Sequence, residues 1–141
     1  MLAAPLVACM TAVAAANGLP PLVLPAIHMV EGGQVGTIAK NANGSEDYGV
    51  MQINSSWLPT LAQGLDRSAS QVRSDLIHDG CFNIAIAGAV MKYKVAQAGG
   101  DIWQAVGYYS SHTASFNAIY QARVAIAAVK IQTGHVTERE K

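Results

Sequence analysis

Apolar residues dominate the first 30 positions and have the spacing of two helices. Residues 2–16 form an alanine-rich run, and the glycine and two prolines that follow it are signals that end a helix. A second apolar run begins at residue 21 or 22 and stops at Gly32 and Gly33, directly after Glu31. The pattern therefore predicts two helices, the second of which carries a carboxylate at its C-terminal end.

Helical spacing disappears between residues 35 and 54. Residues 41–45, Asn-Ala-Asn-Gly-Ser, form a turn signal between two short extended stretches, which predicts a small antiparallel β-hairpin. Ser55 or Ser56 is then expected to cap a short helix that reaches Leu61.

The second half of the chain has the apolar spacing of four further helices. They are expected over residues 71–77, 81–98 and 102–109, and from Thr113 or Ser115 to residue 131. Ser68 and Asp101 precede two of them as capping residues. In the helix expected over residues 81–98, Ala87 and Gly88 are small enough for a neighbouring helix to approach closely.

These elements predict a single domain over residues 1–132, of the α+β class and predominantly helical, with a small β-hairpin. Residues 133–141 are polar and charged and are expected to form a C-terminal tail that frays. A chain of 141 residues is long enough to bury a core of its own.

The composition limits the classes of partner. Nine acidic and nine basic residues balance, and only 13% of residues are charged, so we expect no nucleic-acid binding and no polybasic membrane patch. No apolar run reaches the roughly 20 residues of a spanning helix without Pro or Gly, so no membrane insertion is expected. The four histidines lack the paired spacing of metal ligands, and no metal or cofactor is expected.

Glu31 and Asp47 are the candidate catalytic residues. Glu31 ends a helix, where the macrodipole disfavours negative charge, and apolar neighbours such as Ile27 and Val50 add a desolvation effect. Both effects raise the pKa of its carboxyl group, which keeps a proton available for a leaving oxygen near neutral pH. Two acids beside a cleft suit glycosidic chemistry, in which the second assists at the sugar cation.

Three segments resemble a known family. Residues 43–57, Asn-Gly-Ser-Glu-Asp-Tyr-Gly-Val-Met-Gln-Ile-Asn-Ser-Ser-Trp, look like the central segment of the lysozyme-like superfamily, including the animal c-type lysozymes. Residues 31–36 and 79–84 are closer to the lytic transglycosylases that accompany bacterial conjugation and type IV secretion systems. The resemblance covers roughly residues 19–124 and implies a lysozyme-like domain that cleaves peptidoglycan.

The resemblance also implies roles for the matching residues. Glu31 matches the catalytic acid and base, and the Tyr109 hydroxyl would orient Glu31 or contact the N-acetyl group of the sugar. The substrate-binding candidates that the family motifs give are Gly49, Met51, Gln52, Asn54, Tyr109 and Tyr120. Trp57 and Trp103 could stack on sugar faces, but core positions are favoured for both. His28 could modulate the pKa of Glu31, but a helix-surface position is favoured for it.

Asp47 leaves two alternatives open. In c-type lysozymes the matching aspartate is the second catalytic carboxylate, which would make the chain a hydrolytic muramidase. In lytic transglycosylases one acid/base residue suffices, because the substrate's N-acetyl group participates and its 6-hydroxyl closes a 1,6-anhydro product. Asp47 would then be a hairpin residue that bonds nearby backbone amides.

Three departures from the family pattern keep a non-catalytic peptidoglycan-binding subunit as a further alternative. Gly32 stands where serine is common, Tyr108 replaces the usual alanine, and Ser110 replaces the usual asparagine. Gly32 removes a hydroxyl that would orient the sugar, and Tyr108 would narrow the cleft.

Cys9 and Cys81 lie far apart on apolar helical segments. The residues alone leave two buried thiols and one disulfide equally open. The resemblance implies the disulfide and a periplasmic or exported location, with components of a secretion or conjugation apparatus as partners. The apolar N-terminal run has no basic n-region, so we expect a buried helix of the mature domain there and no signal peptide.

Overall fold

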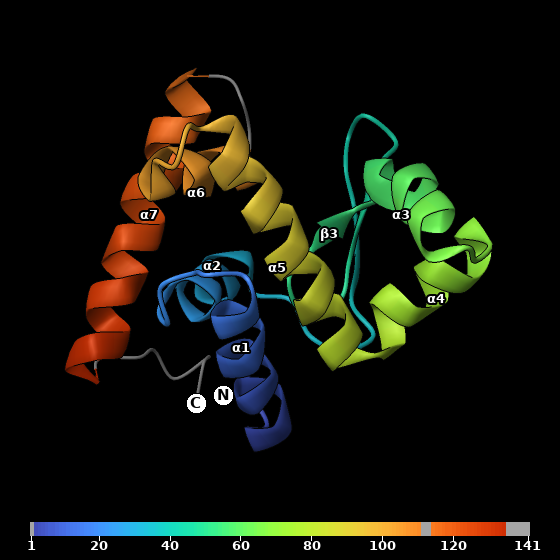
Figure 1. Ribbon diagram of the computed structural model, residues 1–141, viewed down its shortest axis with the longest axis horizontal. Helices are drawn as coiled ribbons and strands as arrows, with labels where there is room; N and C mark the ends of the chain where they lie inside the picture. The colour runs from blue at the N-terminus through green and yellow to red at the C-terminus, as the bar shows by residue number, and fades with distance from the viewer. Residues whose placement is uncertain (1, 111–113, 135–141) are drawn as a thin grey trace.

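The computed structural model describes residues 2–110 and 114–134, which form two lobes on either side of a long central helix (Figure 1). The helices are α1 (Ala4–Ala16), α2 (Val23–Glu31), α3 (Leu58–Leu65), α4 (Ala69–His78), α5 (Gly80–Gln97), α6 (Ile102–Ser110) and α7 (Ala114–Thr133), with a 3₁₀-helix η1 (Ser55–Trp57) before α3. The strands are β1 (Ile38–Lys40), β2 (Glu46–Tyr48) and β3 (Ile53–Asn54). The predicted α+β class with a helical majority is confirmed.

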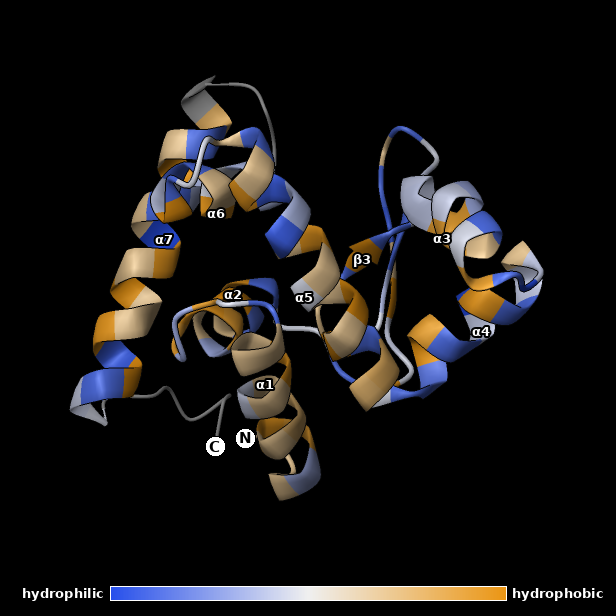
Figure 2. Ribbon diagram, in the orientation of Figure 1, coloured by the Kyte–Doolittle hydropathy of each residue, from blue (hydrophilic) through white to orange (hydrophobic). Residues whose placement is uncertain are grey.

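Helix α5 separates the two lobes. On one side α1, α2, α6 and α7 pack together, and α2 lies against α7. On the other side α3 packs on α4, and α4 contacts both α5 and strand β2. The hairpin carries mostly polar residues, whereas α1, α2 and α7 are rich in apolar ones (Figure 2). A polar strand surface therefore faces a helical lobe across the central helix.

The predicted hairpin is confirmed and has one strand more than expected. Strands β1 and β2 pair antiparallel with Ile38 opposite Tyr48, and β3 adds to the other edge of β2 with Ile53 opposite Tyr48. Strand β3 has only two residues, which is too short to produce a recognisable alternation of apolar and polar positions.

The helix caps agree with the sequence in two cases out of three. The Ser68 hydroxyl accepts the Gln71 N–H at 3.1 Å, and the Asp101 carboxylate accepts the Gln104 N–H at 3.0 Å. The assignment of Ser55 or Ser56 as a cap was wrong, because the Asn54 side chain accepts the Ser56 N–H at 3.0 Å. Asn54 has extended backbone at the end of β3, the geometry that an N-cap requires.

Two predictions fall partly outside the described residues. Helix α7 begins at Ala114, and Thr113, one of its two predicted starts, is not among the residues described. The same holds for positions 135–141 of the predicted polar tail.

The close approach predicted at Gly88 is confirmed. A Cβ atom at Gly88 would lie 2.2 Å from Val13 Cγ1 of α1, so only glycine lets the two helices touch there. Around it Ile84, Ala87 and Met91 are buried. No described helix is both long enough and apolar enough to cross a membrane.

The surface prediction for His28 and the core prediction for Trp103 were wrong. His28 is only 8% exposed, and its Nε2 lies 2.9 Å from the Gly33 carbonyl oxygen because the chain folds back at the end of α2. Trp103 is 48% exposed. It lies in the first turn of α6 and borders an apolar hollow between α2, α6 and α7.

Cys9 and Cys81 form a disulfide with their Cα atoms 5.6 Å apart, as the resemblance implied. The bridge joins α1 to the first turn of α5 and closes a loop with a sequence separation of 72. We expect its removal in a Cys9→Ser, Cys81→Ser variant to lower the free energy of unfolding by about 3 kcal/mol, because the unfolded chain regains freedom. Urea unfolding with and without reductant measures this, and the variant should not respond to reductant.

Candidate active site

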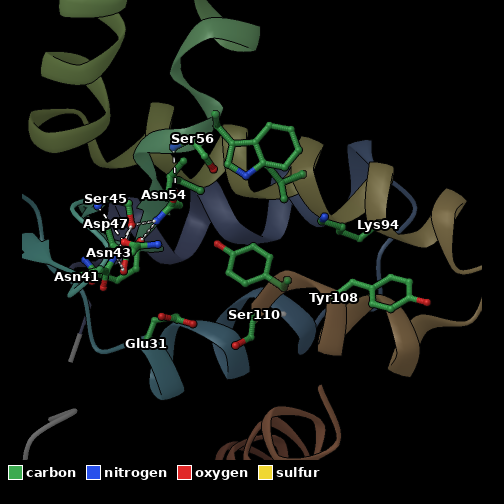
Figure 3. Close-up of a pocket in the computed structure, with 15 residues that line it drawn as sticks. Glu31, Asn41, Asn43, Ser45, Asp47, Asn54, Ser56, Lys94, Tyr108 and Ser110 are labelled. Carbon is green, nitrogen blue, oxygen red and sulfur yellow. Dashed lines mark hydrogen bonds between the residues drawn. The ribbon is translucent and has the colours of Figure 1, made fainter. Parts of the chain in front are cut away.

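A pocket of about 460 Å³ lies where the two lobes meet across α5. Its walls come from the end of α2, the hairpin with β3 and η1, the middle of α5, and the end of α6 (Figure 3). The lining residues are Glu31, Asn41, Asn43, Ser45, Asp47, Gln52, Ile53, Asn54, Ser56, Trp57, Val90, Lys94, Tyr108, Tyr109 and Ser110. Both candidate carboxylates are therefore in one pocket of a size that suits a small ligand.

Two glycines position Glu31 at this pocket. Gly32 has a φ of +70° and donates its N–H to the His28 carbonyl at 2.8 Å, which ends α2 directly after Glu31. A Cβ atom at Gly33 would lie 2.1 Å from the Gly49 carbonyl oxygen, so glycine is needed for the chain to pass against the hairpin. The departure at Gly32 has a physical reason, since a serine there would be strained at that positive φ.

The environment of Glu31 favours its protonated form. Burial of the carboxyl group is the largest cause that raises its pKa, and the negative charge of Asp47 adds to it. A hydrogen bond from the Tyr120 hydroxyl, at 2.7 Å, and the charge of Arg123 act in the opposite direction. The net pKa is raised, which confirms the predicted direction and suits a proton donor.

Tyr120 makes the contact with Glu31 that was considered for Tyr109. The Tyr109 hydroxyl donates instead to the Met51 carbonyl oxygen at 2.8 Å, and burial raises its pKa well above the usual range. Tyr109 lines the pocket, whereas Tyr120 is 5% exposed and is not among the lining residues. Tyr109 thus ties α6 to the hairpin, and Tyr120 fixes the carboxyl group from α7.

We expect Tyr120→Phe to move the pH profile of the reaction. The hydrogen bond from Tyr120 lowers the pKa of Glu31, so its loss raises that pKa further. An acid must be protonated to donate, and the alkaline limb of the kcat/KM profile should therefore shift to higher pH. A merely structural role would lower the rate at every pH and leave this limb in place.

Asp47 is held by side-chain amides. Asn54 Nδ2 donates to one carboxylate oxygen at 2.8 Å, and Asn41 Nδ2 donates to the other at 3.1 Å. The backbone-amide partners expected for a hairpin aspartate are replaced by these two asparagines, one from each flank of β2. Figure 3 shows Asp47 grouped with Asn41, Asn43, Ser45 and Asn54 on the wall across from Glu31.

Gly49 and Met51 are both buried, and their predicted role in substrate binding stays a prediction. Met51 is 0% exposed, and a Cβ atom at Gly49 would lie 2.3 Å from the Leu76 carbonyl oxygen. Gly49 is required by this packing and by its φ of +68°. Both residues shape the turn beneath the pocket and present no side chain to it.

Asn83, which lies within residues 79–84 and is not among the predicted site residues, organises this turn. It is 0% exposed and donates from Nδ2 to the carbonyl oxygens of Tyr48 and Leu76, at 2.8 and 2.9 Å. Its Oδ1 accepts the Met51 N–H at 2.8 Å. A single asparagine within the otherwise apolar first half of α5 was the available clue, since a buried amide must be fully paired.

Gln52 lines the pocket, as does Asn54. Gln52 has a φ of +55°, which is unusual for a residue with a side chain. Its Nε2 donates to the Gly49 carbonyl oxygen at 3.0 Å, so the amide is fixed at the edge of the pocket. Such held backbone strain is typical of functional positions, and the roles of Gln52 and Asn54 toward a sugar stay predictions.

Residues 8–123 match the family described as Transglycosylase SLT domain. The chain belongs to the SLT transglycosylase domain family. The matched residues span most of the chain and include all those that line the pocket. Glu31, Asp47 and Tyr120 all lie within the matched range. The narrower resemblance to transglycosylases of conjugation and type IV secretion systems stays a prediction.

A relative in Escherichia coli O157:H7, described as a peptidoglycan-binding-like protein, is 33% identical over 105 residues. The aligned region covers 70% of this chain and 60% of that relative. The chain therefore spans less than two thirds of the length of the protein it resembles.

Proposed function

We propose that this SLT domain is a peptidoglycan lytic transglycosylase. It cleaves the β-1,4 bond between N-acetylmuramic acid and N-acetylglucosamine and leaves a 1,6-anhydro end. The observation that carries the proposal is Glu31, a half-buried carboxyl group with a raised pKa, fixed by Tyr120 at a pocket of sugar size.

In the first step the Glu31 carboxyl group donates its proton to the glycosidic oxygen, and the bond from that oxygen to C1 of the muramyl sugar breaks. The N-acetyl carbonyl oxygen of the same sugar bonds to C1 and takes up the positive charge. In the second step the Glu31 carboxylate accepts the proton of the 6-hydroxyl group, whose oxygen displaces the acetamido oxygen from C1. One residue serves both steps, and no water is consumed.

Asp47 supports the substrate in this scheme without forming a bond to it. Each of its carboxylate oxygens accepts one hydrogen bond from an asparagine amide, which holds the carboxylate in a fixed orientation. Its negative charge raises the pKa of Glu31, which assists the proton donor. The second candidate function is a muramidase in which Asp47 stabilises the sugar cation. The observation that favours it is that Asp47 and Glu31 line the same pocket.

Mass spectrometry of fragments released from purified peptidoglycan tests the proposal. We expect anhydromuropeptides from the unmodified protein, and the same product from Asp47→Asn at a rate within about tenfold. Reducing ends that have gained water, together with loss of activity in Asp47→Asn, would establish the muramidase instead. Binding without release of any fragment would support the non-catalytic alternative. The description of the relative as peptidoglycan-binding-like agrees with that alternative.

The location of the domain is proposed from its substrate, and its partners are proposed from the sequence resemblance. Peptidoglycan lies outside the cytoplasmic membrane, so we propose that the domain acts there, in the periplasm or after export, and opens the wall locally for a secretion or conjugation apparatus. The support is the resemblance of residues 31–36 and 79–84. In a host that carries such an apparatus, a Glu31→Gln variant should then lower secretion or DNA transfer.

A further inference from the structure

The two ends of the pocket differ in charge. Glu31 and Asp47 line one part of it, and Lys94 lines another. Among the described residues that form the walls, Lys94 is the one with a positive charge. Figure 3 shows Lys94 and Tyr108 at the end of the pocket away from Asp47. A ligand that fills the pocket therefore meets a cation at this end.

Aromatic rings hold the Lys94 ammonium group in place. Its Nζ lies 5.7 Å from the ring centroid of Trp57 and 5.8 Å from that of Tyr93, within the range of cation–π attraction. The two rings meet edge to face with centroids 6.1 Å apart. Lys94 follows Val90 by one helical turn of α5, and both line the pocket, so the long side chain is directed along the cleft wall.

The ammonium group is partly removed from water at this position. Burial lowers the pKa of Lys94, because a charge that loses hydration is less stable. An anion of a bound ligand that reaches this ammonium group would form a charge-assisted hydrogen bond with it. By contrast Lys92, on the exposed side of the same helix, does not line the pocket.

We infer that Lys94 binds a carboxylate of the glycan and thereby selects muramyl-containing strands over uncharged polymers of N-acetylglucosamine. This inference rests on the proposed function and names the group that its substrate must carry. N-acetylglucosamine and N-acetylmuramic acid have the same sugar ring and the same N-acetyl group. N-acetylmuramic acid differs in that it carries a lactyl ether on O3. That ether ends in a carboxylate, or in an amide to a stem peptide that has carboxylates of its own.

Calorimetric binding to Glu31→Gln, which leaves the ligand uncleaved, tests the inference with three oligosaccharides of equal length. One contains only N-acetylglucosamine, one alternates it with peptide-free muramic acid, and one carries amidated lactyl groups with stem peptides. In this background Lys94→Met should lower the affinity for a carboxylate-bearing ligand by about fivefold relative to the neutral one, as expected for a partly screened ion pair. Lys94→Arg should restore most of the preference, and Lys92→Met is the matched control.

The three ligands identify the source of the carboxylate. A loss confined to the peptide-free muramyl ligand assigns the lactyl carboxylate, and a loss confined to the third assigns the stem peptide. Equal affinity for all three ligands, no binding, or a preference that Lys94→Met leaves intact would overturn the inference. These binding results are independent of the fragments released from peptidoglycan, so a failure of the proposed reaction is recognised separately.

Discussion

Replacing Glu31 by glutamine is expected to reduce the cleavage of peptidoglycan by about 1,000-fold, the range for loss of a general acid–base group. Glutamine has nearly the same shape and still accepts the Tyr120 hydroxyl hydrogen bond, but it cannot supply a proton to the glycosidic oxygen. The same residue takes the proton of the 6-hydroxyl in the second step, so both halves of the reaction are lost. Release of soluble fragments over time measures the effect.

Glu46→Gln is the matched control. Glu46 also lies half-buried in the polar sheet, but it accepts hydrogen bonds from Tyr48 and Arg73 and does not line the pocket. Its change should leave the rate per folded molecule within about twofold. A Glu31→Gln protein that is folded, binds glycan and still cleaves at near-normal rate would remove Glu31 from the mechanism.

The position of Glu31 was predictable because local sequence determines it. A helix that ends in Gly32 and Gly33 can be recognised without knowledge of the fold, since one glycine supplies the positive φ and the other the close approach. The capping residues Ser68 and Asp101 were predictable for the same reason, because each bonds a backbone N–H three residues away.

The partners of Glu31 depend on long-range packing, which local sequence does not determine. Tyr109 and Tyr120 were both expected near the cleft, but the crossing of α7 over α2 decides which one reaches the carboxyl group. That contact joins positions 89 residues apart. The exposure of Trp103 was missed for a related reason, since an aromatic residue in an apolar helix gives no indication of which side the neighbouring helices leave open.

Asn83 explains why the turn that carries the pocket residues keeps its shape. It binds the backbone on both sides of Gly49, through the Tyr48 carbonyl oxygen and the Met51 N–H. Met51 in turn accepts the Tyr109 hydroxyl, so one buried amide connects α5, the turn and α6. The site therefore depends on a residue that does not line the pocket.

Replacing Asn83 by leucine is expected to lower the free energy of unfolding by about 5 kcal/mol. The change leaves two carbonyl oxygens and one N–H without their partners in a fully buried region, and each unsatisfied group costs about 1–3 kcal/mol. Because small domains are stable by only about 5–15 kcal/mol, the variant should be close to unfolded at room temperature. Urea unfolding measures the loss, with Gln97→Leu, an exposed amide on the same helix, as control.

Asn83→Asp separates the contribution of the acceptor from that of the donor. Its carboxylate can still accept the Met51 N–H, but it cannot donate to the carbonyl oxygens of Tyr48 and Leu76 and places a charge beside them. We expect it to destabilise the domain at neutral pH and to recover partly in acid, where a protonated carboxyl group regains one donor.

An Asn83→Leu protein whose unfolding free energy stays within about 1 kcal/mol of the original would show that water replaces the lost partners. The turn would then owe its shape to the packing of Gly49 and Gly33 alone.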